Sequence, residues 1–126
     1  MLQLLLVSSG GALGAIVRYS IGNLSKIYFV NSFYATLSIN IIGSFLIGYL
    51  ISLGYVKNIS ENFIKYFLII GFLGSFTTFS AFSYEAVDLF LSKKMFLSLV
   101  YVIFSISFCI IAAYVGIYIN KVWLKF

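Results

Sequence analysis

The chain has 126 residues, of which 63% are hydrophobic and 9% charged, and its mean hydropathy is +1.13. A soluble domain carries about 25% charged and about 45–50% apolar residues, so this composition excludes a water-soluble globule. At about 20 apolar residues per transmembrane helix, the chain has room for four spans and short loops in one membrane domain, residues 1–126. Its formal charge of +5 indicates interfacial anchoring in the lipid bilayer, and no nucleic-acid partner is expected.

Enzymatic activity is not expected. Histidine is absent and Cys109 is the only cysteine, which removes the usual neutral-pH base, the commonest metal ligands and any intrachain disulfide. No acid, base and nucleophile set can be assembled at membrane depth.

Four apolar segments predict an all-α integral membrane protein. We expect transmembrane helices over residues 2–22, 33–56, 62–91 and 95–120. The first segment lacks a basic leader and contains Gly10, Gly11 and Gly14, which favour close helix packing over a cleaved signal peptide. Four spans place both termini on the same side of the membrane.

Basic residues are divided evenly between the two sides. One side holds Lys57, Lys65, Lys121 and Lys125, and the other holds Arg18, Lys26, Lys93 and Lys94. Because the positive-inside rule then selects neither side as cytoplasmic, the chain is predicted to insert in both orientations and to pair as an antiparallel homodimer. An even split can also arise by chance, and pairing with an oppositely inserted near-twin is the alternative to pairing with itself.

The third segment is too long for one straight helix. About 30 residues of helix would reach about 45 Å, against about 30 Å of hydrocarbon. Two glycines and four hydroxyl residues cluster at its centre, in residues 71–80, where the hydroxyls can satisfy the backbone of an interrupted helix. We therefore expect a break near residues 74–78, close to mid-membrane, enclosing a buried site. Close packing of small residues is the alternative explanation.

Several polar residues lie within the predicted spans. Asn40 is too deep in the second span to be a cap, and it should either bond across helices or line a water path. Tyr101 and Ser105 share one helix face in the fourth span, where hydroxyls can form a ladder of donors. Phe79 and Phe82 project from one face just after the predicted break, and ring edges bordered by donors suit a small hard anion.

Three charged residues have two interpretations each. Glu85 and Asp88 could form a proton-coupled pair, although nearby lysines favour a wetted helix end. Arg18 could snorkel to the interface or gather anions at a vestibule.

Three motifs and a residue pair resemble the Fluc (CrcB) family of fluoride channels along nearly the whole chain. GGALGAIVRY (residues 10–19) resembles the family's G-G-x-x-G-A-x-x-R-Y, and ATLSINIIGSFLIG (residues 35–48) resembles G-T-x-x-x-N-x-x-G-x-F-x-x-G. GFLGSFTTFSAFSYE (residues 71–85) resembles G-x-x-G-x-x-T-T-F-S-T-F-S-x-E. The Tyr101 and Ser105 pair resembles the start of the family's polar track.

The resemblance implies a dual-topology homodimer in the cell membrane of a prokaryote, with two antiparallel pores that pass fluoride passively and reject chloride. It implies one structural Na⁺ at the dimer centre, held by backbone carbonyls of Gly74 and Thr77 from each subunit. The fluoride path would be lined by Asn40, Phe79, Ser80, Phe82, Tyr101 and Ser105, with Arg18 in the vestibule. The family's role is to let trapped cytoplasmic fluoride leak out.

The chain departs from the family pattern at four positions. Ala35 stands where glycine is usual, Ala81 where a third threonine is common, and Cys109 and Ala113 where the polar track often continues with serine or threonine. The track is therefore not extended beyond Ser105. The alternative function is a small multidrug or guanidinium-type proton-coupled antiporter, which would need an early membrane carboxylate that the first span lacks.

Overall fold

The computed structural model of the chain describes residues 1–28, 33–54 and 62–123, and the elements in these ranges are all helical. They are α1 (Leu2–Tyr28), α2 (Phe33–Gly54), η1 (Phe63–Leu73), α3 (Gly74–Phe76), α4 (Phe79–Leu91) and α5 (Met95–Trp123), with η1 a π-helix. Helices suit apolar segments because the bilayer core offers their backbone groups no partners.

Four stretches are long and apolar enough to cross a bilayer: Leu2–Ile27, Phe33–Leu53, Phe63–Leu91 and Met95–Ile119. They confirm the predicted all-helical class with four spans. Helix α1 continues beyond the predicted end at residue 22, because a helix does not stop where its apolar run stops. Residues 55 and 56, at the end of the predicted second span, lie outside the described residues.

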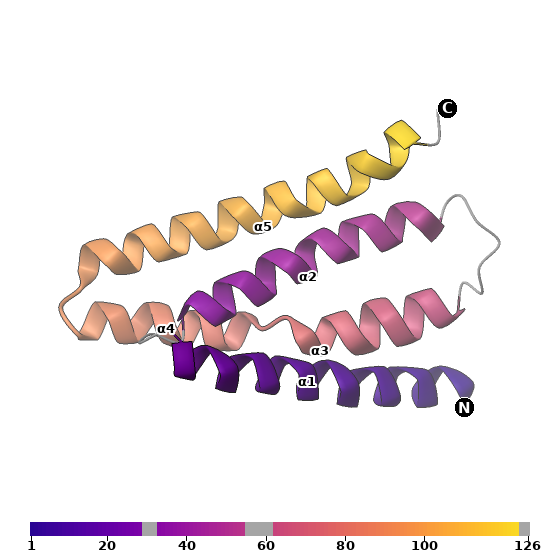
Figure 1. Ribbon diagram of the computed structural model, residues 1–126, viewed down its shortest axis with the longest axis horizontal. Coiled ribbons are helices and arrows are strands. Elements are labelled where there is room, and N and C mark those ends of the chain that lie inside the picture. Colours follow the sequence, from indigo (N-terminus) through magenta and orange to yellow (C-terminus); the bar gives the residue numbers. More distant parts are fainter. Residues whose placement is uncertain (29–32, 55–61, 124–126) are drawn as a thin grey trace.

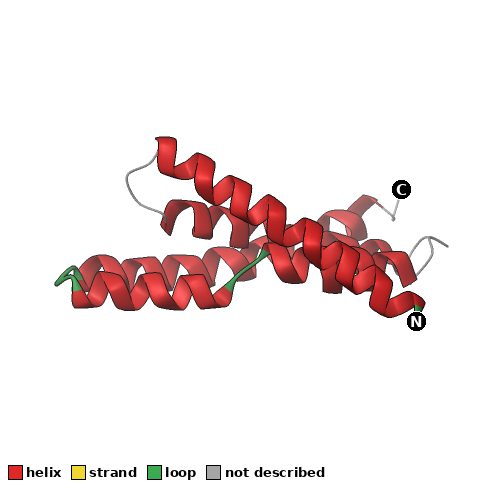
Figure 2. Cartoon of the chain, turned by 90° about the horizontal axis from the view of Figure 1, so that it is seen from below, coloured by secondary structure: helices red, strands yellow, loops and turns green. Residues whose placement is uncertain are grey.

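Two helix pairs dominate the packing. Helix α2 lies beside α5, while α1 packs against η1 and α3 (Figure 1). The start of α1 and the end of α5 lie at the same end of the molecule (Figure 1), as an even number of spans requires. Seen from below, α1 lies across the helices behind it (Figure 2). The first half of the third apolar segment therefore packs on α1, and its second half, α4, packs on α5.

Glycines allow both pairs to approach closely. A Cβ atom at Gly10 or Gly14 of α1 would overlap backbone oxygens of η1. In the other pair, a Cβ at Gly48 would overlap the Ala113 carbonyl oxygen. Small residues four apart are the usual means of close packing in membranes, where helices gain nothing from burying apolar surface away from lipid. These glycines thus allow α1 to pack closely on η1, and α2 to pack closely on α5.

The third segment changes conformation at two threonines. Thr77 has φ −78° and ψ 154°, and Thr78 has φ −148° and ψ 113°, so both are extended between α3 and α4. The two residues, called the 77–78 step below, form the loop between helices at the centre of Figure 2. The chain contains no proline, so the step arises from hydrogen bonds that compete with the helical ones.

The turn between α4 and α5 is closed by a Schellman motif. The Lys93 N–H donates to the Phe90 carbonyl at 3.1 Å, and the Lys94 N–H donates to the Leu89 carbonyl at 3.0 Å. Lys93 has φ 62°, the left-handed conformation that glycine or asparagine adopts more readily. This turn places two exposed lysines at the end of the molecule opposite the start of α1.

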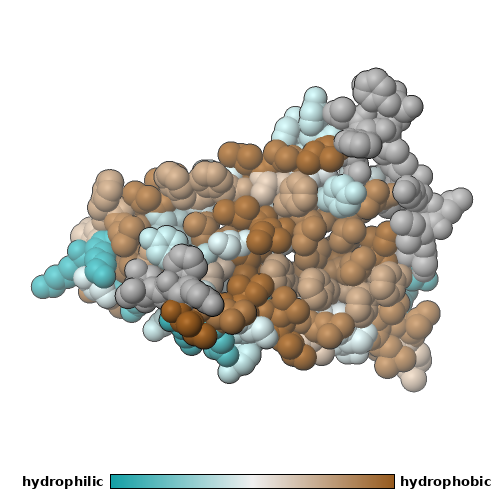
Figure 3. Space-filling model, viewed as in Figure 1, coloured by the Kyte–Doolittle hydropathy of each residue, from teal (hydrophilic) through white to brown (hydrophobic). Residues whose placement is uncertain are grey.

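Large apolar side chains are also exposed on the outside of the helices. Phe96 is 82% exposed, and Leu4 and Ile110 are similarly open. Apolar residues cover most of the visible helical surface in Figure 3. Such a surface suits contact with lipid or with another membrane helix rather than with water.

Candidate functional site

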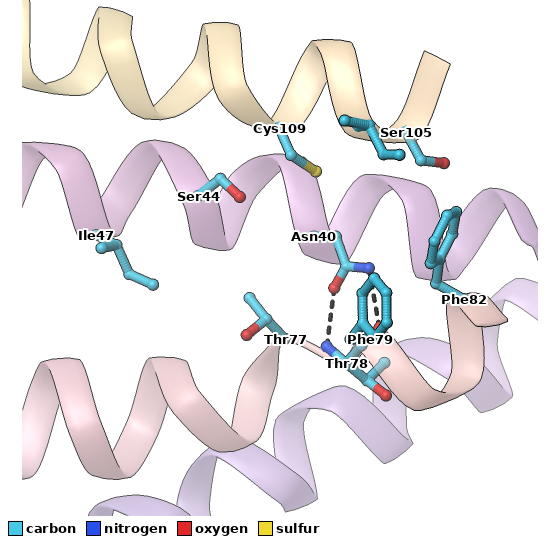
Figure 4. A pocket seen from close by; sticks show the side chains of 10 residues that line it. Asn40, Ser44, Ile47, Thr77, Thr78, Phe79, Phe82, Ser105 and Cys109 are labelled. Carbon is cyan, nitrogen blue, oxygen red and sulfur yellow. Dashed lines mark hydrogen bonds between the residues drawn. The ribbon is translucent and has the colours of Figure 1, made fainter. Parts of the chain in front are cut away.

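A cavity of about 250 Å³ lies at the 77–78 step, between α2, the start of α4 and α5. It is lined by Asn40, Ser44, Ile47, Thr77, Thr78, Phe79, Phe82, Ser105, Ile106 and Cys109 (Figure 4). The structure thus brings together five residues that the sequence analysis singled out from three different spans: Asn40, Thr77, Phe79, Phe82 and Ser105.

Asn40 of α2 bonds to both backbone groups of Thr78. Its Nδ2 donates to the Thr78 carbonyl oxygen at 3.0 Å, and its Oδ1 accepts from the Thr78 N–H at 2.9 Å (Figure 4). The cross-helix bond that the sequence left as one alternative is therefore present, and the same side chain lines the cavity. One amide hydrogen of Asn40 is not used by these two bonds and can serve as a donor to an occupant of the cavity.

The 77–78 step releases two carbonyl oxygens from their helical partners. In a continuous α-helix, the Gly74 carbonyl would accept from the Thr78 N–H, and the Thr77 carbonyl from the Ala81 N–H. The Thr78 N–H donates to Asn40 instead, and the Ala81 N–H donates to the Thr78 hydroxyl at 3.2 Å. Carbonyls freed in this way have the chemistry that a hard monovalent cation requires.

A row of aromatic rings leads from the cavity into the protein. The ring centroids of Phe79 and Phe82 are 5.4 Å apart, and those of Phe82 and Tyr101 are 5.3 Å apart. Phe79 is 77% exposed, whereas Phe82 is only 7% exposed. The positive edges of such rings can face an anion without binding it tightly.

The two hydroxyls of the predicted ladder have different surroundings. Ser105 is 4% exposed, and its Oγ has no hydrogen-bond partner among the described residues, although it lines the cavity. The Tyr101 hydroxyl donates to Glu85 Oε2 at 2.7 Å, and Tyr101 is not among the lining residues. A buried hydroxyl without a partner is unfavourable, so Ser105 favours a polar occupant of the cavity.

Glu85 joins three helices. Its Oε1 accepts from the Thr36 hydroxyl of α2 at 2.8 Å, and its Oε2 accepts from Tyr101 of α5. The interpretation as a wetted helix end is therefore wrong for the half-buried Glu85, whereas Asp88 is exposed. The cause is tertiary packing, because the side chains of α2 and α5 replace water around the carboxylate.

Two residues of α2 at the site were not predicted from the sequence. Thr36 and Ser44 lie one turn before and one turn after Asn40, so the three form a polar stripe on one face of an apolar helix. Thr36 binds Glu85 and Ser44 lines the cavity. The spacing of four residues is visible in the sequence and could have identified all three residues, but only Asn40 was predicted.

Two predicted residues lie outside the cavity lining. The Ser80 hydroxyl is 3.2 Å from the Thr78 hydroxyl, and Ser80 is exposed at the start of α4. Arg18 is half-buried on α1. Neither residue is among those that line the cavity.

Comparison with known proteins identifies the family. Residues 5–117 match the family described as CrcB-like protein, Camphor Resistance (CrcB). A fluoride-specific ion channel FluC of Gloeothece citriformis is 45% identical over 122 residues, which cover 96% of this chain and 98% of the relative. Fluoride-specific ion channel FluC 2 of Clostridium acetobutylicum is 41% identical over 117 residues, 92% of this chain and 96% of the relative.

A third relative is similar over almost the same length. The fluoride-specific ion channel FluC of Dehalococcoides mccartyi is 36% identical over 120 residues, which cover 94% of this chain and 92% of the relative. The resemblance drawn from the three sequence motifs is confirmed by these matches. The chain therefore belongs to the CrcB family, the family of the FluC proteins.

Proposed function

We propose that this multi-pass membrane protein is a fluoride-selective channel and that fluoride passes through the cavity at the 77–78 step. The relatives that match nearly the whole chain are named fluoride-specific ion channels. The amide, hydroxyl and aromatic groups that line the cavity suit an ion path rather than an enzyme. The observation that carries the proposal is the pair of hydrogen bonds between Asn40 and Thr78, because these bonds fix a neutral donor beside two phenylalanine rings.

Fixed donors replace the hydration that fluoride loses. Asn40 and Ser105 line the same cavity, and their amide and hydroxyl donors are both neutral. Neutral donors bind an anion strongly enough to admit it and weakly enough to release it. Chloride is larger and fits a narrow path between the rings of Phe79 and Phe82 poorly. Selectivity then depends on both the width of the path and its donors.

The channel is proposed to be an antiparallel homodimer with two pores. Phe79 is 77% exposed in one chain although it borders the cavity, and a second copy would cover it. The even division of basic residues supports insertion in both orientations. Ser80 and Tyr101 would then line the fluoride path beyond the cavity that Ser105 lines, with Arg18 at a vestibule.

The third span is proposed to be broken near mid-membrane, with a structural Na⁺ at the break. The 77–78 step is close to the middle of the 29-residue stretch Phe63–Leu91. Gly74 and Thr77 would supply carbonyl oxygens from each copy, and both have lost their helical donors. The ion would contribute positive charge where backbone dipoles of two copies converge.

A proteoliposome flux assay tests this function against the antiporter alternative. Vesicles containing the purified protein are loaded with potassium fluoride, and valinomycin starts efflux, which a fluoride electrode records. We expect rapid passive fluoride release, little chloride release and no dependence on a proton gradient. Proton-coupled uptake of a guanidinium ion, or no flux of any of these ions, would contradict the proposal. In the cell, such a leak would remove fluoride that enters as the neutral acid and is trapped as the anion.

A further inference from the structure

The thiol of Cys109 faces the cavity at the 77–78 step. Cys109 is the only cysteine of the chain, it is half-buried, and it lies one helical turn beyond Ser105 on α5. It lines the same cavity as Asn40 and Ser44. In Figure 4 its sulfur points away from the α5 axis, toward the side on which Asn40 and Ser44 of α2 lie. In the family pattern this position often carries a serine or threonine of the polar track, and the resemblance assigns no role to a thiol here.

A second observation favours a polar occupant of the cavity beside this thiol. The hydroxyl of Ser105 is 4% exposed and has no hydrogen-bond partner among the described residues. A buried hydroxyl of this kind requires a polar partner, which the cavity can supply and lipid cannot. Since Ser105 and Cys109 are four residues apart on one helix face, the thiol adjoins the same polar space.

We propose that Cys109 is a modification site for small thiol-directed electrophiles and that an adduct there closes the fluoride path. The proposal rests on the proposed channel function. With a methanethiosulfonate, the Cys109 sulfur attacks the sulfenyl sulfur of the reagent and forms a disulfide. The bond between that sulfur and the sulfonyl group breaks, methanesulfinate leaves with the electron pair, and the thiol proton passes to water.

Blockage follows from the size and chemistry of the adduct. The cavity has a volume of about 250 Å³, so an organic group attached to Cys109 occupies a large part of it. Such a group offers no hydrogen-bond donor and displaces the polar occupant from Ser105 and Asn40. An anion that depends on these donors for its lost hydration then has no path.

The test compares a charged reagent with a lipid-soluble one. Proteoliposomes are treated on both sides with 2-(trimethylammonium)ethyl methanethiosulfonate, which cannot enter lipid, and separately with N-ethylmaleimide. We expect the charged reagent to lower fluoride efflux at least about tenfold, and dithiothreitol to restore it. Intact-protein mass spectrometry should record one adduct on each chain.

Two variants provide matched controls, each compared with its own untreated efflux. Cys109→Ser removes the thiol and should make efflux insensitive to the reagent. Cys109→Ser combined with Ser107→Cys moves the thiol to an exposed position of the same helix, outside the cavity lining. This double variant should react with N-ethylmaleimide and keep its efflux.

Three results would overturn the proposal. One is a full adduct on Cys109 with unchanged efflux, which would separate the thiol from the ion path. Another is reaction with N-ethylmaleimide but not with the charged reagent, which would place the thiol in lipid. The third is an untreated protein that carries no fluoride, in which case the channel function itself fails, whatever the adduct mass.

Discussion

At the scale of single residues, the site depends on one amide that meets both backbone groups of an extended residue. Asn40 acts toward Thr78 as a neighbouring strand would, with one donor and one acceptor. Serine and threonine have one hydroxyl and cannot match this pattern, and a carboxylate lacks the donor. An amide side chain at this position therefore fits the geometry of the 77–78 step better than any of these groups.

Asn40→Asp should abolish fluoride efflux. The carboxylate would face the Thr78 carbonyl without a donor and would place a fixed negative charge beside the ion path. Two like charges about 4 Å apart repel by about 4 kcal/mol at an effective dielectric constant of about 20. That energy corresponds to about a thousandfold lower rate, measured as initial efflux from proteoliposomes.

Asn40→Ala separates the effect of the added charge from the effect of losing the two hydrogen bonds to Thr78. It removes both bonds to Thr78 without adding a charge, so we expect its efflux to lie between those of the native protein and Asn40→Asp. Gel filtration should verify that each variant elutes as the native protein does. Efflux of Asn40→Asp within a factor of two of native would exclude Asn40 from the ion path.

At the scale of helices, Glu85 ties α4 to α2 and α5 through two hydroxyl donors. Tyr101→Phe should lower the free energy of unfolding by about 1.5–3 kcal/mol, because it leaves one oxygen of a half-buried carboxylate without its donor. The measurement is thermal or denaturant unfolding in detergent. Tyr114→Phe, at an exposed position of the same helix, is the matched control and should change stability by less than about 0.5 kcal/mol.

A double-mutant cycle identifies the partner of Tyr101. In the background of Glu85→Gln, the cost of Tyr101→Phe should fall by about 0.5–3 kcal/mol, since the charged acceptor is gone. Equal costs in both backgrounds would mean that the tyrosine hydroxyl stabilises the fold through some other group.

The close helix pairs predict opposite effects for two glycines of α1. A Cβ at Gly14 would overlap the Phe72 carbonyl, whereas a Cβ at Gly22 would meet nothing within 4 Å. Gly14→Ala should therefore lower the free energy of unfolding by about 1–3 kcal/mol. Gly22→Ala should raise it by up to about 1 kcal/mol through helix propensity. Unfolding in detergent measures both, and a similar change in both variants would contradict this packing.

The sequence predicted what depends on local pattern. Apolar length predicted the four spans. The cluster of glycines and hydroxyls in residues 71–80 includes Thr77 and Thr78, whose backbone is extended. It could not identify Thr78 as the partner of Asn40, because the two are separated by 38 residues and meet only when α2 packs on the third segment. The partners of Glu85 were missed for the same reason.

Two local features also had no signal in the sequence. The π-helical turns of η1 occur in a run of apolar residues that suits an α-helix equally well. The left-handed Lys93 occupies a position where glycine is the usual residue, so the Schellman turn was not visible.

At the scale of the whole molecule, orientation in the membrane depends on very few charges. The predicted topology gives each side of the membrane four basic residues, so removing two from one side should decide the orientation. The turn between α4 and α5 is the place to do so, because Lys93 and Lys94 are exposed there and asparagine accepts the left-handed conformation of Lys93.

Lys93→Asn together with Lys94→Gln should make the α4–α5 turn face outward in nearly all chains. A reporter is Ser92→Cys in the Cys109→Ser background, labelled in intact cells by an impermeant thiol reagent. With native charges, about half of the chains should be labelled from outside, because both orientations are populated. With the two lysines removed, nearly all should be labelled, and fluoride efflux should fall because antiparallel pairs can no longer form. Complete labelling, or none, with native charges would contradict dual insertion.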